Sequence, residues 1–223
     1  MESERYLRQM SIIDMDLLPN VPIHVIGAGG IGSMTTLLLA KMGAQNITVY
    51  DFDDLEDHNI SNQTYHFDDV GKPKVEALRD LIHAMEGFEI NIHNEKFTGE
   101  EEDLSGIVVI GVDNMAARKE IYENLSVNFS QRVDLLIDAR MGAQTMEIIP
   151  LSFLSEDSRS KYEGRLFSDQ EAMDLPCTER AIIYNTAGIG AMIGNMVRKH
   201  LAGELSVTTH YIFDYQTMSL LQV

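Results

Sequence analysis

The stretch "HVIGAGGIGSMTTLLLAKMGAQNITVYDFD", residues 24–53, decides the fold of this chain. Its short apolar start ends in Gly27, which is typical of a buried parallel strand that turns sharply. Ile31, Met34 and Leu38 then recur at helical spacing, and Gly43 provides a helix end. The β-branched run that follows, "NITVYD", predicts a second strand. The stretch therefore predicts a strand, a glycine turn, a helix and a second parallel strand.

The same alternation of strands and helices continues beyond this stretch. We expect strands in 88–97, 106–114 and 134–140, with "QTMEIIPL" following, and two short strands in 209–223. We expect helices over 3–10, 74–85, from Asp113–Asn114 onward, and about 180–200, with a long crossover loop at about 152–176. This order predicts an α/β fold, a doubly wound, Rossmann-like and mainly parallel sheet with helices on both faces and antiparallel strands at the C-terminal end. Residues 1–223 are expected to form one nucleotide-binding domain.

Composition narrows the classes of function. The chain has 223 residues and a formal net charge of −18, so its surface repels nucleic acid and anionic membranes. Residues 181–197 are apolar, but they contain two asparagines and three glycines, which favours a buried helix over a membrane span. The first residues have no apolar core of the signal-peptide type, so we expect a cytoplasmic protein. A single cysteine, Cys177, rules out an internal disulfide and a cysteine-rich zinc site.

The glycine turn predicts a nucleotide site. Gly27, Gly29 and Gly32 fit G-x-G-x-x-G, and Gly30 lies within the same loop. Such a turn lets backbone amides approach a phosphate, and the start of the following helix adds a partial positive charge. Asp51 ends the second strand, where a carboxylate accepts hydrogen bonds from ribose hydroxyls. These features indicate an adenine nucleotide, and by themselves they leave NAD, FAD and ATP open.

Further polar residues favour a triphosphate over a dinucleotide. A triphosphate needs cations, which Lys74, Arg8 and a metal ion held by Asp113 would supply, whereas a nicotinamide ring needs none of these. The carboxyl ends of strands are where doubly wound sheets bind ligands, so Asp51, Asp113 and the glycine turn are expected to converge. The residues that extend this set are Asp53, Asn59 and Arg118.

At this point the chain resembles the ThiF/MoeB/HesA superfamily, the adenylyltransferases similar to ubiquitin-activating enzymes. The resemblance rests on "RYLRQ", "IGAGGIGS", "VYDFDDLEDHNISNQ", "VGKPKVEAL" and "GVDNMAARKE", in family order over roughly the first 120 residues. It implies ATP and Mg²⁺, adenylation of the C-terminal carboxylate of a small ubiquitin-like or sulfur-carrier protein or a peptide, and release of pyrophosphate. It also implies a homodimer.

The resemblance assigns roles by position. Asp51 would bind ribose, Asn59 and Lys74 would contact phosphates or the reacting carboxylate, and Asp113 would help to hold Mg²⁺. Arg8 would reach a phosphate, in many members from the partner subunit. The remaining residues that we expect at the nucleotide are Asp53, Asn62, Gln63, Asn114 and Arg118.

Two departures from the family and one cysteine leave alternatives open. Asn62 stands where the family usually has an arginine, and the zinc-binding CxxC pairs of many members are missing, as in a short, minimal member. Cys177 lies near the segment where some members form a thioester with the activated acyl group, although a lone cysteine is also compatible with an ordinary residue. Because asparagine at position 62 supplies no positive charge, a second interpretation stays open. In it the protein binds a nucleotide and serves as a partner or scaffold but does not catalyse adenylation. A NAD-dependent oxidoreductase is a third.

Overall fold

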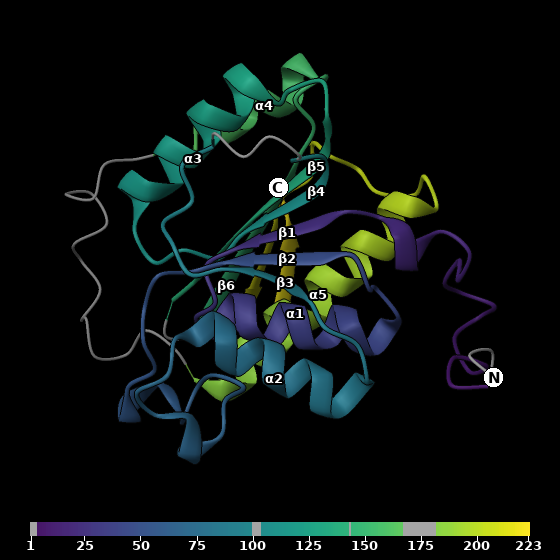
Figure 1. Ribbon diagram of the computed structural model, residues 1–223. Coiled ribbons are helices and arrows are strands. Elements are labelled where there is room, and N and C mark those ends of the chain that lie inside the picture. Colours follow the sequence, from purple (N-terminus) through teal and green to yellow (C-terminus); the bar gives the residue numbers. More distant parts are fainter. Residues whose placement is uncertain (1–3, 100–103, 143, 167–181) are drawn as a thin grey trace.

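The structure is a computed structural model that describes residues 4–99, 104–142, 144–166 and 182–223. These residues build an eight-stranded sheet in the order β3-β2-β1-β4-β5-β6-β7-β8 (Figure 1). The first five strands run parallel, and β6, β7 and β8 each pair antiparallel with the strand before them. The strands are β1 Ile23–Ile26, β2 Ile47–Tyr50, β3 Asn91–His93, β4 Gly106–Ile110, β5 Val133–Met141, β6 Thr145–Leu151, β7 Tyr211–Asp214 and β8 Ser219–Gln222.

Helices cover both faces of the sheet (Figure 1). Helices α1 (Gly30–Met42), α2 (Lys74–Glu86) and α5 (Ile183–Leu201) lie on one face, where they bury the larger apolar core. Helices α3 (Met115–Asn128) and α4 (Glu156–Glu163) cover the other face and bury a second core that contains Phe153 and Tyr162. The predicted doubly wound α/β fold with C-terminal antiparallel strands is confirmed.

Local signals in the sequence correctly placed several helix ends. Gly43 ends α1 with φ 106°, a left-handed conformation that glycine adopts without steric cost. The side chain of Asn114 accepts a hydrogen bond from the Ala117 amide, and it therefore caps α3 as expected. Helix α2 begins at Lys74, the residue predicted from the sequence. None of the described helices is long and apolar enough to cross a membrane.

The start of the chain differs from the prediction. Residues 4–12 form successive turns, so the described part of the helix expected over 3–10 is not a helix. Its side chains are tied to other elements instead, because Gln9 donates to the Met42 carbonyl (2.5 Å) and Arg5 donates to the Glu86 carbonyl (2.7 Å). These contacts with the ends of α1 and α2 outweigh the weak helical preference of a short segment.

The segment expected to be a long loop also differs. Within 152–176, residues 156–163 form α4, whose first turn is capped by the side chain of Ser155. The helix is polar along most of its length, so its periodicity in the sequence is weak. It is held by burial of Tyr162 against the second core and by a hydrogen bond from the Ser158 hydroxyl to the Val207 carbonyl (2.7 Å). Tertiary contacts therefore form a helix that the pattern alone does not show.

Candidate active site

The candidate site lies at the edge of the sheet where the parallel strands end. In register, Tyr50, Ile26, Ile110 and Asp138 lie side by side on β2, β1, β4 and β5. The chain leaves β1 for α1 on one face and leaves β4 for α3 on the other (Figure 1). A crevice between two such diverging connections is where doubly wound sheets bind ligands. The fold thus brings the glycine turn, Asp51 and the loop that carries Asp113 to one edge.

The glycines of the turn have different steric roles. Gly27 has φ 95°, and a Cβ there would lie 3.0 Å from the Gly111 carbonyl oxygen. A Cβ on Gly32 would lie 1.7 Å from the Gly27 carbonyl oxygen, so only glycine fits where α1 packs on β1. A Cβ on Gly29 would meet no described atom within 4 Å. Gly29 therefore faces open space at the start of α1, where the phosphate of a nucleotide is expected.

Ala28, at the centre of the turn, is held through both of its backbone polar groups. Its amide donates to Asp51 Oδ2 (2.6 Å), and its carbonyl accepts a hydrogen bond from the Tyr65 hydroxyl (2.6 Å). Asp51 Oδ1 accepts from the Asp53 amide (2.8 Å), and each carboxylate oxygen keeps a second lone pair for a ribose hydroxyl. Burial raises the pKa of Asp51 despite these amide hydrogen bonds, and burial also raises the pKa of Tyr65 well above its ordinary value.

Tyr65 belongs to a loop, residues 53–73, that folds back on its own start. Leu55 donates its amide to the Lys72 carbonyl (2.8 Å), and the Lys74 amide donates to the Asp53 carbonyl (3.0 Å). The Lys74 ammonium lies 2.6 Å from Asp53 Oδ2, with only 9% of the lysine side chain exposed against 51% for the aspartate. The structure thus brings Lys74, Asp53 and Asp51 to the same edge, as predicted, with Lys74 paired to a carboxylate.

Asn59 has a structural role within this loop. It ends a short 3₁₀ turn, Asp57–Asn59, and its Oδ1 accepts a hydrogen bond from the Glu56 amide (3.0 Å). The Glu56 and Asn59 side chains form a reciprocal capping box. Asn59 is buried, and its predicted contact with a phosphate or carboxylate stays a prediction.

The next residues of the loop carry buried polar atoms without partners. Asn62 Oδ1, Gln63 Oε1 and Thr64 Oγ1 have no hydrogen-bond partner among the described residues. The Asn62 carbonyl oxygen lies 3.3 Å from where a Cβ on Gly30 would be, so this stretch lies against the start of α1. Buried polar groups without partners are rare in folded proteins and ask for an explanation such as a ligand. The three partnerless oxygen atoms are therefore the feature of this stretch that fits a bound nucleotide.

The loop after β4 presents the predicted metal ligand. Asp113 is exposed, and its Oδ1 accepts a hydrogen bond from Asn114 Nδ2 (3.1 Å). The described residues contain no group of three or more His, Cys, Asp or Glu side chains that could hold a metal ion. Mg²⁺ is commonly bound by one or two carboxylates together with substrate phosphates, so Asp113 fits a site that the nucleotide would complete.

Arg118 is arranged differently from the expectation. It is buried, one terminal nitrogen donates to Asp138 Oδ1, and the other donates to the Val112 carbonyl oxygen. In this structure the guanidinium is therefore engaged with the protein beneath the Asp113 loop. Its contact with a nucleotide stays a prediction.

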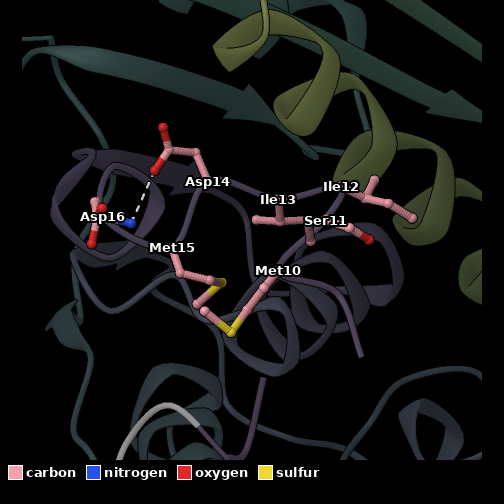
Figure 2. A pocket seen from close by; sticks show the side chains of 7 residues that line it. All are labelled: Met10, Ser11, Ile12, Ile13, Asp14, Met15 and Asp16. Carbon is pink, nitrogen blue, oxygen red and sulfur yellow. Dashed lines mark hydrogen bonds between the residues drawn. The ribbon is translucent and has the colours of Figure 1, made fainter. Parts of the chain in front are cut away.

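Arg8 lies at the opposite end of the domain. Its neighbours Arg5 and Gln9 contact the C-terminal ends of α2 and α1. Because α1 has 13 residues, its two ends are about 20 Å apart. Residues 10–16 of the same segment line a pocket there (Figure 2), and Met15 packs at Gly43, the end of α1. Arg8 therefore does not meet the glycine turn of its own chain, and Cys177 lies outside the described residues.

Comparisons with known proteins agree with this geometry. The molybdopterin-synthase adenylyltransferase of Escherichia coli strain K12 is 28% identical over 233 residues, which cover 98% of this chain and 90% of the relative. The probable adenylyltransferase/sulfurtransferase MoeZ of Mycobacterium tuberculosis strain H37Rv is 34% identical over 128 residues, which cover 52% of this chain and 33% of MoeZ. The chain thus spans nearly all of the first relative and matches a third of the second.

Solved structures share the fold. The crystal structure of Escherichia coli MccB with AMPCPP and MccA has a TM-score of 0.76 at 15% identity, covering 99% of this chain and 71% of MccB. The crystal structure of PaaA has the same TM-score, 0.76, at 19% identity, covering the whole of this chain and 73% of PaaA. The sequence model of the ThiF family matches residues 4–221. With that match over nearly its whole length, the chain belongs to the ThiF family.

Proposed function

We propose that this protein is an ATP-dependent adenylyltransferase that activates the C-terminal carboxylate of a small ubiquitin-like or sulfur-carrier protein or a peptide. One observation carries the proposal. At one edge of the sheet, a glycine turn held by Asp51 and Tyr65 lies with Lys74 beside buried polar atoms that have no partner among the described residues. The E. coli relative is named an adenylyltransferase, and MccB has been crystallised with ATP and with MccA.

The residues present fit ATP better than a dinucleotide. Open space at Gly29, the amides at the start of α1 and the ammonium of Lys74 supply groups that favour phosphate oxygens. The Asp53 carboxylate that pairs with Lys74 is half exposed, so exchanging that contact for a phosphate costs little free energy. Asp113 would hold Mg²⁺, which would neutralise charge on the phosphates when bound.

The reaction needs little acid–base chemistry from the protein. An oxygen of the acceptor carboxylate forms a bond to the α-phosphorus of ATP, and the bond from that phosphorus to the bridging β-phosphate oxygen breaks. Pyrophosphate leaves with the electron pair, and no general base is required because the carboxylate is already an anion. Negative charge grows on the phosphate oxygens, where the glycine-turn amides and Lys74 stabilise it. In a homodimer, Arg8 of a second copy would add a further cation.

The experiment that tests this role is acceptor-dependent exchange of pyrophosphate into ATP. Lys74→Ala is expected to lower the exchange rate by the equivalent of about 2.7–4 kcal/mol, the loss typical of one preorganised donor. Lys72→Ala is the matched control, because Lys72 is exposed, pairs with Asp69 and lies two residues away. An unchanged rate for Lys74→Ala would exclude this role for Lys74.

A second function, a nucleotide-binding partner or scaffold without adenylation, is favoured by one observation, the asparagine at position 62. An asparagine supplies no charge where the family usually has a cation. Calorimetry that detects ATP binding, together with no pyrophosphate exchange for a panel of carboxylate acceptors, would favour this second function. Exchange with one acceptor would exclude it.

A further inference from the structure

A buried charge cluster lies beneath the loop that carries Asp113. At its centre is Asp138 on β5, whose side chain has no solvent exposure. Asp138 Oδ2 accepts hydrogen bonds from Arg140 Nε (2.8 Å), Arg140 Nη2 (2.7 Å) and the Tyr162 hydroxyl (3.1 Å), and Oδ1 accepts from Arg118. Both oxygens of the Asp138 carboxylate thus accept hydrogen bonds from the protein. Its side chain has no surface exposed to a ligand, so it acts through its partners.

Arg118 connects this carboxylate to the loop. Its two terminal nitrogens donate to different partners, one to Asp138 and the other to the carbonyl of Val112, the residue before Asp113. The Arg118 amide also donates to the carbonyl of Asn114, the residue after Asp113 (3.3 Å). The guanidinium holds the backbone before Asp113, and the first backbone hydrogen bond of α3 holds it after Asp113, while the Asp113 carboxylate stays exposed at the sheet edge. Only a planar guanidinium offers two donors in this fixed fork.

We infer that Asp138 and Arg118 are positioning residues that orient Asp113 for the metal–nucleotide complex without touching it. This inference rests on the proposed function, because it assigns Asp113 to Mg²⁺–ATP. Groups that orient a metal ligand typically change metal affinity about 10–100-fold when they are removed. A buried ion pair is weak support for stability alone, so the cluster is better explained by what it orients.

The first measurement needs no activity. Hydrogen–deuterium exchange of the nucleotide-free protein is expected to be faster for the amides of 111–117 in Asp138→Asn and in Arg118→Lys than in the wild type. Arg118→Lys keeps the buried positive charge that balances Asp138 but removes the second donor, which contacts Val112. The variant therefore tests the link between Asp138 and the loop without changing the buried charge. It also decides the matter if Asp138→Asn does not fold.

Glu86→Gln is the matched control. Glu86 is a buried carboxylate at the end of α2, at the opposite edge of the sheet, with its Oε1 2.5 Å from the Lys41 ammonium and 5% of its side chain exposed. The substitution removes the charge of a buried carboxylate, as Asp138→Asn does, although its cation partners are about half exposed, and it touches nothing near Asp113. Exchange at 111–117 is expected to match the wild type in this variant.

The second measurement is calorimetry of ATP binding over a range of Mg²⁺ concentrations. Half-saturating Mg²⁺ is expected to rise about 10–100-fold in Asp138→Asn and Arg118→Lys, and to be unchanged in Glu86→Gln. Where exchange activity is measured, the KM for the acceptor is expected to be unchanged. Wild-type Mg²⁺ dependence and wild-type amide exchange in folded Arg118→Lys would overturn the inference. Absence of pyrophosphate exchange in the wild type would instead count against the proposed function. Amide exchange and Mg²⁺-dependent ATP binding would still decide whether Asp138 and Arg118 position Asp113.

Discussion

Two polar clusters at the same edge of the sheet are built in opposite ways. Around Asp138 both oxygens of a fully buried carboxylate accept hydrogen bonds, from two arginines and a tyrosine. At residues 62–64 three buried side-chain polar atoms have no partner among the described residues. A buried polar group without a partner costs about 1–3 kcal/mol, whereas a paired one costs little net. We propose that the first cluster orients the loop at this edge and that the polar atoms of the second contact a ligand.

The largest effect on stability is expected at the glycine turn, against which residues 62–64 lie. Gly32→Ala places a Cβ 1.7 Å from a backbone oxygen, which must move, so we expect a loss of about 4–5 kcal/mol in the free energy of unfolding. Urea denaturation measures it. Gly29→Ala, which faces open space, is expected to change stability by less than about 1 kcal/mol yet to weaken ATP binding. Equal stability losses in the two variants would contradict the steric assignment.

The paired cluster is expected to respond strongly to loss of its central charge. Asp138→Asn leaves Arg118 and Arg140 buried with less compensation, and breaking a buried pair from one side costs about 3–5 kcal/mol. Urea denaturation at pH 7 checks it. A loss of less than about 1 kcal/mol in the free energy of unfolding would show that pairing of Asp138 contributes little to stability.

A third buried polar group gives the molecule a pH dependence. His24 on β1 is buried, its Nδ1 lies 3.2 Å from the Tyr50 hydroxyl, and burial first, then His93, lower its pKa to about 4. The unfolded chain binds the proton near pH 6.5, so stability is lost as the pH falls from 6.5 to 4, by about 3 kcal/mol. Denaturation midpoints at pH 7 and pH 5 should differ less in His24→Gln. The raised pKa of Asp51 acts with the opposite sign in both proteins and cancels in that comparison.

The smallest effect distinguishes ligand groups from scaffold groups. Thr64→Val removes a buried hydroxyl that has no partner among the described residues, so we expect stability to be unchanged or raised by about 1 kcal/mol while ATP binding weakens. Thr36→Val in α1 is the matched control, since its hydroxyl is also buried and without a described partner. Calorimetry should show normal ATP affinity for the control. Normal affinity in both variants would remove Thr64 from the site.

Much of the fold follows from local pattern. The strand–turn–helix of residues 23–42, the Asn114 cap and the Gly43 helix end depend on neighbouring residues, and all were predictable. Helix α4 was not, because its burial of Tyr162 depends on a core assembled from distant segments. The helix expected at the start of the chain failed for the same reason, since distant contacts of Arg5 and Gln9 replace it.

The site divides in a similar way. The positions of Asp51, Asp113 and the glycine turn at strand ends were enough to predict that they come to one edge of the sheet. They were not enough to find Tyr65, whose hydroxyl reaches Ala28 across 37 positions, or the pairing of Arg118 with Asp138 across 20. No local signal marks such partners, because their contacts exist only once the sheet has formed.

Adenylation by this protein is tested most directly by pyrophosphate exchange into ATP with a small carrier protein as acceptor. We predict exchange that requires Mg²⁺ and a free C-terminal carboxylate, and that is absent when the same acceptor is amidated at its C-terminus. Exchange that is equally fast with the amidated acceptor would exclude adenylation of the C-terminal carboxylate. Tighter binding of NADH than of ATP would contradict the proposed function.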